Sequence, residues 1–444
     1  MSRERLSKDQ DFSSPERQHI LDDNARFRRL GWKRLTVICI VEAIALGSLG
    51  LPSAFATLGM VAGVILTISI GVLATYAGYS IGQVKLKYPQ IRHYADVGPL
   101  LLGKFGSIFI GSFVALLIFV IGSHCLTGAI AFHTITQSNL CSVVFSIISA
   151  GILMLLAIPP SFAEIAVLGY IDFASIMTAI GITVISTGIQ NLNSSAPVVD
   201  YSQWSAWPKP DISFSAAIVA VNNIVFAYSF AGCLPSFMED MHKPEDYVKS
   251  LWWLGGIQIV IYTLVGALLY TFVGQGVQSP ALLSAGPLIS RIVFGIALPV
   301  IFISGSINST VVCRYIHGTI YRHSSTHLIN TPMGWITWIS LVFLVTILAW
   351  IIAEAIPIFS DLLSIISALF VSGLSFYIPP IMWFSLLKEG SWYEKHNIKS
   401  AVFNAAVFLV GIVVFGCGIY SSIAELVSKF QSGTISRTFT CSSG

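Results

Sequence analysis

Residues 47–55 read Gly-Ser-Leu-Gly-Leu-Pro-Ser-Ala-Phe, inside an apolar stretch that runs from about residue 35 to residue 57. The two glycines lower the local preference for helix, and Pro52 removes a backbone donor while its ring displaces the preceding turn. We therefore expect a helix here that opens between Gly47 and Pro52. Unpaired backbone groups are costly in lipid, so such an opening is tolerated where it lines a polar cavity.

A second interruption is expected in the apolar stretch from about 212 to 238, where residues 226–235 read Phe-Ala-Tyr-Ser-Phe-Ala-Gly-Cys-Leu-Pro. Freed N–H groups suit a carboxylate, whereas freed carbonyls suit an ammonium group or a cation. The two interruptions together predict a binding site for a zwitterion such as an amino acid. The alternative is that Gly and Pro only permit kinks and close packing here, as they often do in membrane helices.

The composition of the whole chain is that of a membrane protein. Its 444 residues are 55% hydrophobic and only 10% charged, with a mean hydropathy of +0.79, whereas a soluble domain carries about 25% charged residues. The net charge of +3 gives no strongly basic field for nucleic acid, so the expected partner is the lipid bilayer. We predict an all-α polytopic membrane protein with eleven transmembrane helices, at about 35–57, 59–83, 106–136, 140–158, 167–189, 212–238, 249–273, 286–317, 333–353, 358–386 and 401–424.

The distribution of positive charge predicts the orientation of these helices. If the N-terminus is cytosolic, every Lys and Arg lies at the inner side except Lys209, Arg291, Lys429 and Arg437. Positive residues favour the cytosolic side, so the N-terminus is expected inside and the C-terminus outside. The glycosylation pattern Asn193-Ser194-Ser195 in the longest outer connection fits this orientation.

Five helices per set give the second set the opposite topology, which predicts a 5+5 inverted repeat with interrupted helices 1 and 6. The expected segments are a cytosolic N-terminal tail (1–34), the first five-helix repeat (35–189), an extracellular loop (190–211), the second, inverted repeat (212–386), an inner loop with the eleventh helix (387–424) and a C-terminal tail (425–444).

No motif for covalent chemistry was recognised. The seven cysteines are scattered, mostly in apolar stretches, and we interpret them as small packing residues. Without a CxxC pair or a His-rich spacing, no zinc site is expected. Without a phosphate loop, energy is expected from an ion gradient rather than from ATP. The sequence therefore predicts neither an enzyme nor a bound metal or cofactor.

The motifs resemble those of one family. Residues 47–55, the inner-loop motifs Tyr-Ala-Asp-Val-Gly (94–98) and Gly-Lys-Phe-Gly (103–106), and Phe-Ala-Tyr (226–228) resemble the amino acid/auxin permease family, and within it the fungal neutral amino acid permeases. The resemblance covers roughly residues 25–425. It implies a LeuT-like fold and movement of amino acids with protons, or with sodium in some members.

The same resemblance implies the substrate contacts. The carboxylate is expected at the interruption of helix 1, and the amine at carbonyls of helix 6, with helices 3 and 8 completing the pocket. The candidate substrate-binding residues are Gly47, Ser48, Leu49, Gly50, Phe226, Ala227, Tyr228, Ser123 and His124.

Several polar side chains within the apolar stretches are candidates for ion coupling. Glu42 lies five residues before Gly47, at a depth where an ionised carboxyl group is costly. It is expected either to take part in proton coupling or to serve as a structural residue bonded to another helix. His124 is a candidate for the pocket or for a proton relay, with a hydrogen bond inside the bundle as the alternative.

Helix 8 carries a polar cluster in which Ser306, Ser309 and Thr310 share one side. LeuT-like proteins often hold a cation with helix 8 hydroxyls, so this cluster marks a sodium site, a remnant of one, or hydrogen bonds between helices. Glu239 and Asp240, which close helix 6, are expected to form an inner gate or a solvated face.

The leading hypothesis is a proton-coupled symporter of neutral amino acids, especially those with large apolar or aromatic side chains, that works by alternating access in the plasma membrane. Its partners would be a neutral amino acid and a proton gradient, with sodium as the alternative ion. The rival hypotheses are an amino acid exporter of the vacuolar membrane and a sensor of the same fold that binds amino acids without net transport.

Overall fold

The computed structural model describes residues 30–138, 140–160, 162–193, 204–321 and 331–432, and within them the fold is helical, with one isolated β-bridge between Leu30 and Met241. The predicted cytosolic tail before residue 30 and the two serines of the glycosylation pattern lie outside the described residues. In chain order the helices are α2 (Trp32–Leu58), α3 (Met60–Lys87), η1 (Tyr94–Asp96), α4 (Val97–Leu102), η2 (Gly103–Phe105), α5 (Gly106–Thr136), α6 (Ser142–Leu156), α7 (Phe162–Asn193), α8 (Phe214–Ala227), η3 (Ser229–Gly232), α9 (Leu234–Glu239), η4 (Pro244–Asp246), α10 (Tyr247–Val273), η5 (Gly274–Gly276), η6 (Ala281–Ala285), α11 (Pro287–Ile320), α12 (Pro332–Ala355), α13 (Phe359–Ile366), the π-helical η8 (Ser367–Tyr377), α14 (Ile378–Met382), the π-helical η9 (Trp383–Leu387) and α15 (Ile398–Gln431).

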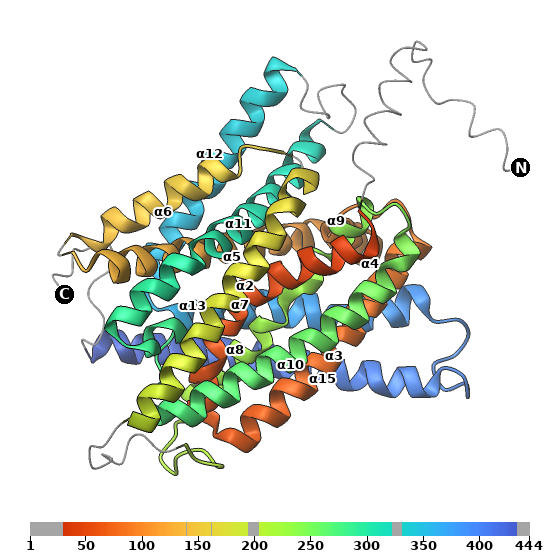
Figure 1. Cartoon of the computed structure of the whole chain (residues 1–444). Helices are drawn as coiled ribbons and strands as arrows, with labels where there is room; N and C mark the ends of the chain where they lie inside the picture. The colour runs from red at the N-terminus through yellow and green to blue at the C-terminus, as the bar shows by residue number, and fades with distance from the viewer. Residues whose placement is uncertain (1–29, 139, 161, 194–203, 322–330, 433–444) are drawn as a thin grey trace, which may run out of the picture.

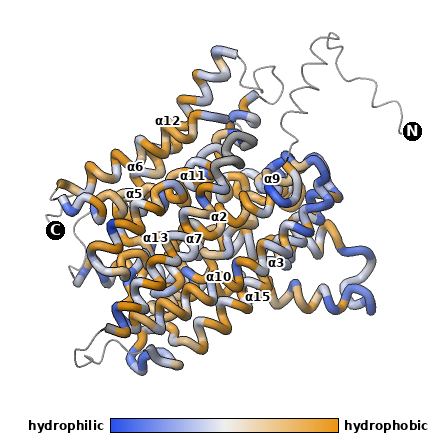
Figure 2. The backbone as a smooth tube through the Cα atoms, in the orientation of Figure 1, coloured by the Kyte–Doolittle hydropathy of each residue, from blue (hydrophilic) through white to orange (hydrophobic). Residues whose placement is uncertain are grey.

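The outer surface of the helices is apolar, as lipid requires. Large hydrophobic side chains such as Ile65, Phe343 and Leu409 are more than half exposed, and Figure 2 shows hydrophobic residues along the helices with hydrophilic ones gathered near their ends. Eight helices are long and apolar enough to cross a membrane, and the bent α2 raises the number to nine among the described residues. Each predicted range coincides with a helix or a run of helices, but α6 and α8 are shorter than a span, so the count of eleven is not confirmed.

The prediction that helix 1 is broken is confirmed, but the break is a bend, and the backbone does not open between Gly47 and Pro52. α2 stays wound from Trp32 to Leu58 with Pro52 inside it, and it bends by 46° between Ile44 and Leu46. The Ser48 hydroxyl donates to the Ile44 carbonyl at 2.6 Å, a bond to the preceding turn that often accompanies a bent helix. The interruption is therefore a bend one turn earlier than expected, with helical backbone on both sides.

The prediction that helix 6 is interrupted is confirmed. α8 begins at a proper cap, because the Ser213 hydroxyl accepts a hydrogen bond from the Ala216 amide, and it ends at Ala227. Tyr228 leaves the helix, four residues form η3, and the short α9 starts with Pro235 in its first turn, where proline fits a helix.

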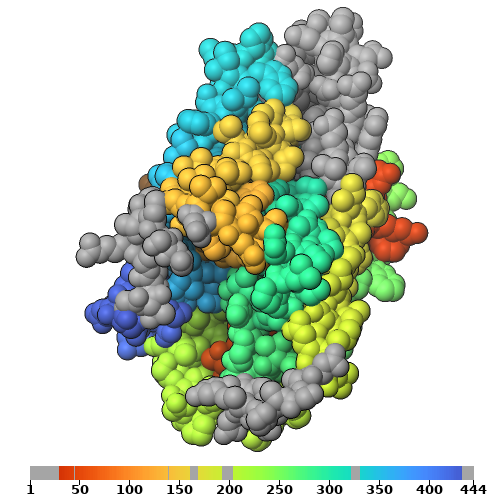
Figure 3. Space-filling model, turned by 60° about the vertical axis from the view of Figure 1, so that its left-hand side comes forward, coloured from red at the N-terminus to blue at the C-terminus, as the bar shows by residue number. Residues whose placement is uncertain are grey.

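The bend and the interruption meet in the middle of the molecule. α2 packs against α8 and α10, while α11 packs against α5 and α7 (Figure 1). Gly47 lies at the closest approach, since a Cβ there would come within 2.7 Å of the Ala227 Cα atom. On the face shown in Figure 3, α11 lies beside α7.

One cysteine departs from the predicted packing role. Cys141, the residue before α6, is disulfide-bonded, whereas Cys39, Cys125, Cys233 and Cys313 are free and buried as expected. Disulfides persist in oxidising compartments. The last cysteine of the chain lies outside the described residues.

Candidate functional site

A small buried cavity lies where the bend of α2 meets the interruption after α8. Its volume is about 20 Å³, which is room for about one water molecule. Four segments line it: the middle of α2, the middle of α5, the chain from α8 to α9, and α11. The lining residues are Glu42, Ala43, Leu46, Gly47, Leu116, Leu117, Val120, His124, Phe226, Ser229, Gly232, Cys233 and Asn308.

Glu42 is the charged residue of this cavity, and two residues of α11 hold its carboxylate. The Asn308 side-chain amide donates to Oε1 at 2.6 Å, and the Ser304 hydroxyl donates to Oε2 at 3.4 Å. The same Ser304 hydroxyl lies 3.5 Å from Nε2 of His124. The sequence-predicted Glu42 and His124 are therefore joined through one α11 side chain.

A tyrosine of α10 ties the bend to the interruption. The Tyr262 hydroxyl lies 2.6 Å from the Ala43 carbonyl and 3.0 Å from the Ala227 carbonyl. A phenol has one hydrogen to donate, so the hydroxyl can bond fully to only one of the two carbonyls at a time. The other carbonyl oxygen can still accept a hydrogen bond. The sequence analysis missed Tyr262, because nothing in the apolar pattern of its helix marks which tyrosine faces inward.

The structure divides the predicted substrate-binding residues into two groups. Three of them line the cavity: Gly47, Phe226 and His124. Ala227 lies next to Phe226, and its carbonyl accepts a hydrogen bond from Tyr262. The others are buried without lining it: Ser48 donates to its own helix, Leu49 is buried, Gly50 packs against Leu363, Ser123 donates to Val120, and Tyr228 donates to the Thr67 carbonyl.

The predicted hydroxyl cluster of helix 8 does not reach Glu42. Ser306 donates to the Ile303 carbonyl and Thr310 to the Ser306 carbonyl, both on α11 itself. The Ser309 hydroxyl is buried without a hydrogen-bond partner among the described residues. The side of α11 that faces Glu42 instead carries Ser304 and Asn308, because these two residues are one helical turn apart.

Ion pairs close the side of the site toward which α9 points. Glu239, at the end of α9, lies 2.5 Å from Nζ of Lys85 on α3. Asp240, the next residue, lies 3.4 Å from the Arg314 guanidinium on α11. The backbone of Leu30 also bonds to Asp240. Glu239 and Asp240 are thus paired, which favours the gate interpretation over a solvated face.

The Tyr-Ala-Asp-Val-Gly motif (94–98) and the residues just before it bond to helices on the same side as these ion pairs. The buried Tyr94 donates from its hydroxyl to the Leu374 carbonyl of η8 at 2.5 Å. His93 lies 2.9 Å from the Ser236 hydroxyl on α9. The Asp96 carboxylate accepts hydrogen bonds from the amides of Arg92 and His93 and so fixes the turn.

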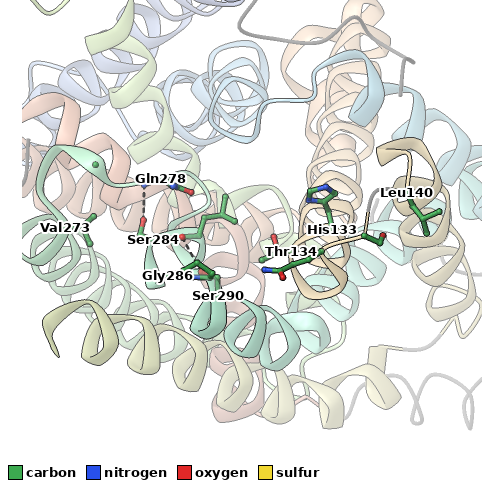
Figure 4. Close-up of a pocket in the computed structure, with 13 residues that line it drawn as sticks. His133, Thr134, Leu140, Val273, Gln278, Ser284, Gly286 and Ser290 are labelled. Atoms are coloured by element: carbon green, nitrogen blue, oxygen red, sulfur yellow. Dashed lines mark hydrogen bonds between the residues drawn. The ribbon is translucent and has the colours of Figure 1, made fainter. Parts of the chain in front are cut away.

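A larger hollow of about 540 Å³ lies at the opposite ends of α5 and α11. Figure 4 shows His133 and Thr134 of α5 across from Gln278 and Ser284, which belong to the α10–α11 connection. Nine residues separate His133 from His124, about 14 Å along a helix. The hollow therefore lies well away from the buried cavity and on the side of the disulfide-bonded Cys141.

An all-helical membrane-spanning chain with an interrupted helix against a bent one at a buried polar cavity has the LeuT-like transporter fold. Solved structures share this fold. MhsT in complex with L-phenylalanine gives a TM-score of 0.55 at 12% identity, covering 87% of this chain and 98% of that one. A nucleobase-cation-symport-1 family transporter in a closed conformation, with bromovinylhydantoin bound, gives 0.54 at 13% identity, covering 91% and 93%.

The sequence itself identifies the family. The family described as transmembrane amino acid transporter protein matches residues 28–424. The N amino acid transport system protein of Neurospora crassa is 52% identical over 423 residues, which is 95% of this chain and 90% of the relative. Amino acid transporter AVT3C of Arabidopsis thaliana is 22% identical over 411 residues, or 87% of this chain and 89% of the relative. The chain belongs to this family of amino acid transporters, and its predicted resemblance is confirmed.

Proposed function

We propose that the protein carries neutral amino acids across a membrane together with protons, by alternating access. The observation that supports this most directly is the meeting of the α2 bend, the α8 interruption and the Glu42 carboxyl group at one buried cavity. Acceptor carbonyls and a carboxylate suit the ammonium group of a zwitterion. The names of the relatives, and the L-phenylalanine bound to MhsT, support the substrate class.

The lining of the cavity supports a neutral side chain. Leu116, Leu117 and Val120 of α5 form one wall, and Phe226 contributes an aromatic ring. No Lys or Arg is among the described lining residues, so a charged substrate side chain would have no counter-charge beyond Glu42. We retain Gly47, Phe226, Ala227 and His124 as substrate-binding positions, with a preference for apolar or aromatic side chains.

The small size of the cavity supports alternating access. Room for about one water is too small for an amino acid, so the segments around the cavity must move apart to admit one. The ion pairs of Glu239 and Asp240 close one side, and the hollow near His133 lies on the other. We propose that the hollow leads toward the site when the side of the ion pairs is closed.

The membrane and the orientation belong to the same proposal. We propose the plasma membrane, with the N-terminus cytosolic and the ion pairs on the inner side. The disulfide at Cys141 supports an outer location of the α5–α6 connection. Imaging of the tagged protein distinguishes this from a vacuolar exporter, because a vacuolar signal would exclude the plasma-membrane assignment.

The test is uptake of labelled neutral amino acids into proteoliposomes, with proton and sodium gradients imposed separately. An inward proton gradient is expected to drive accumulation above equilibrium, and a protonophore is expected to abolish it. Accumulation driven by a sodium gradient alone would mean that the coupling ion is sodium rather than the proton. Binding without any uptake would favour a sensor and overturn the proposal.

A further inference from the structure

A second carboxyl group lies unpaired in the membrane interior. Asp172 is in α7, within the candidate span Gly169–Leu192, and its relative exposure is 0%. Neither of its carboxylate oxygens has a hydrogen-bond partner among the described residues. A polar group buried in this way is costly, and a charged one more so. Asp172 is also the lone charged residue of the predicted helix at 167–189, a signal that the sequence analysis did not use.

The neighbours of Asp172 place it between α2 and α11. One turn earlier, Gly169 faces Val37 and Val41 of α2, whose side chains lie 3.9 and 3.8 Å from the position of an added Cβ. One turn later, Ser175 donates to the Ile296 carbonyl of α11. Residues three apart share a helix face, so Asp172 lies on the face that meets α2 next to Val41.

That location brings Asp172 close to Glu42, the residue after Val41. The two carboxylates are near enough for their negative charges to repel each other. Among the described residues, neither takes part in an ion pair within 4 Å. Ionising both of two buried carboxyl groups that repel each other carries a large cost, so the pair retains one proton.

The hydrogen bonds indicate which carboxyl group holds the proton. Glu42 accepts donors from Asn308 and Ser304, which stabilise it in the ionised state. Asp172 accepts none and is the better place for the proton. The other titratable groups around the pair are Cys39 on α2, His124 on α5, Cys233 before α9 and Tyr262 on α10.

We propose that Asp172 and Glu42 form the proton-binding pair of the transporter, with the proton on Asp172 and the ionised Glu42 facing the ammonium group of the substrate. This inference rests on the proposed function and adds the group that holds the proton. When Asp172 is protonated, Glu42 stays ionised and binds the ammonium group. When that proton leaves to solvent, both carboxylates are ionised, and their repulsion moves Glu42 out of its place in the substrate site, so substrate affinity falls.

The pair also lies where it can respond to movement. The bend of α2 begins two residues after Glu42, so a change in this bend would alter the separation of Glu42 from α7. Because linkage is reciprocal, substrate that binds ionised Glu42 strengthens proton binding at Asp172 by the same factor.

The test measures substrate affinity against pH in purified protein, together with proton-driven uptake and exchange in proteoliposomes. For the wild type, affinity is expected to fall as pH rises, by up to about tenfold per unit for one linked proton. Asp172→Asn mimics the protonated state, so it is expected to bind substrate with little pH dependence and to exchange it, while losing accumulation driven by protons. Asp172→Glu is expected to restore part of the pH dependence.

Thr183→Val, on the same helix, is the matched control because its buried hydroxyl bonds only to its own helix; it is expected to keep the wild-type pH profile. Wild-type pH dependence in Asp172→Asn would overturn the pair while leaving proton-coupled transport intact. Absence of proton-driven uptake in the wild type would instead sink the proposed function. If Asp172→Asn does not fold, infrared spectra of the wild type decide: a protonated carboxyl band at neutral pH supports the pair, and its absence refutes it.

Discussion

The single hydroxyl group of Tyr262 lies within hydrogen-bonding distance of two main-chain carbonyls. Ala43 O belongs to the last turn before the α2 bend, and Ala227 O ends α8. Since the hydroxyl donates one hydrogen at a time, it can stabilise one carbonyl while the other stays available for the proposed substrate. The residue is therefore a positioning residue for both segments, from a third helix.

Replacing this hydroxyl tests that role. Tyr262→Phe is expected to raise the KM for substrate several-fold and to lower stability by about 1 kcal/mol, the typical net value of a buried hydrogen bond. Uptake kinetics and thermal denaturation measure the two effects. Tyr270→Phe, on the same helix but bonded to the loop residue Ser205, is the control and should leave KM unchanged. An unchanged KM in Tyr262→Phe would argue against the bridging role.

At the level of elements, α9 connects the interruption to the end of the bundle that carries the ion pairs of Glu239 and Asp240. It is only six residues long, and the acidic side chains at its end pair with α3 and α11. Its Ser236 also contacts His93 of the inner loop. The Tyr-Ala-Asp-Val-Gly motif thus has a structural purpose: Tyr94 anchors the loop on η8, and the loop in turn meets α9.

Weakening these contacts should open the inner side. Asp240→Asn removes the negative charge from the Asp240–Arg314 ion pair. It is expected to increase several-fold the rate at which a thiol reagent added from the proposed inner side labels the cavity cysteine Cys233. Arg314→Asp combined with Asp240→Arg is expected to restore slow labelling.

The matched control for this experiment is Asp246→Asn, which removes the partner of the exposed Lys249. A surface pair of this kind contributes little, so its labelling rate should equal that of the wild type. Equal rates in Asp240→Asn and Asp246→Asn would mean that the Asp240 pair does not hold the gate closed.

For the whole molecule, the two ends of the bundle differ in chemistry. One end carries Lys85, Lys104 and the ion pairs of α9, while the other carries the disulfide-bonded Cys141 and the hollow near His133. Positive charge at one end and a disulfide at the other support the proposed orientation by two independent physical arguments.

Labelling from the two sides tests that orientation. Thr136→Cys and Lys104→Cys introduce thiols at exposed positions at opposite ends of α5 and its preceding turn. An impermeant reagent added to intact cells is expected to label Thr136→Cys directly, and Lys104→Cys only after permeabilisation. The reverse pattern would invert the proposed topology.

The sequence predicted much of the fold because membrane-spanning helices are recognisable as long apolar stretches. Apolar stretches of spanning length, bounded by charge, coincide with the helices of the structure. The interruption of helix 6 was also predicted, since Gly232 and Pro235 act locally on backbone conformation. Helix 1 is also broken, but by a bend between Ile44 and Leu46. Gly47 is needed for its close approach to Ala227, and the helix accommodates Pro52 without opening.

The sequence by itself determined that this is a helical membrane protein, the family to which it belongs, and that Glu42 and His124 are exceptional among apolar neighbours. Only the tertiary structure decided that Ser304 and Asn308, rather than Ser306 and Thr310, face Glu42, and that Asp172 is fully buried, one turn after a residue that faces α2. The reason is physical: local propensity and hydropathy depend on neighbours along the chain, whereas contacts between helices depend on how each helix is rotated against partners more than a hundred residues away.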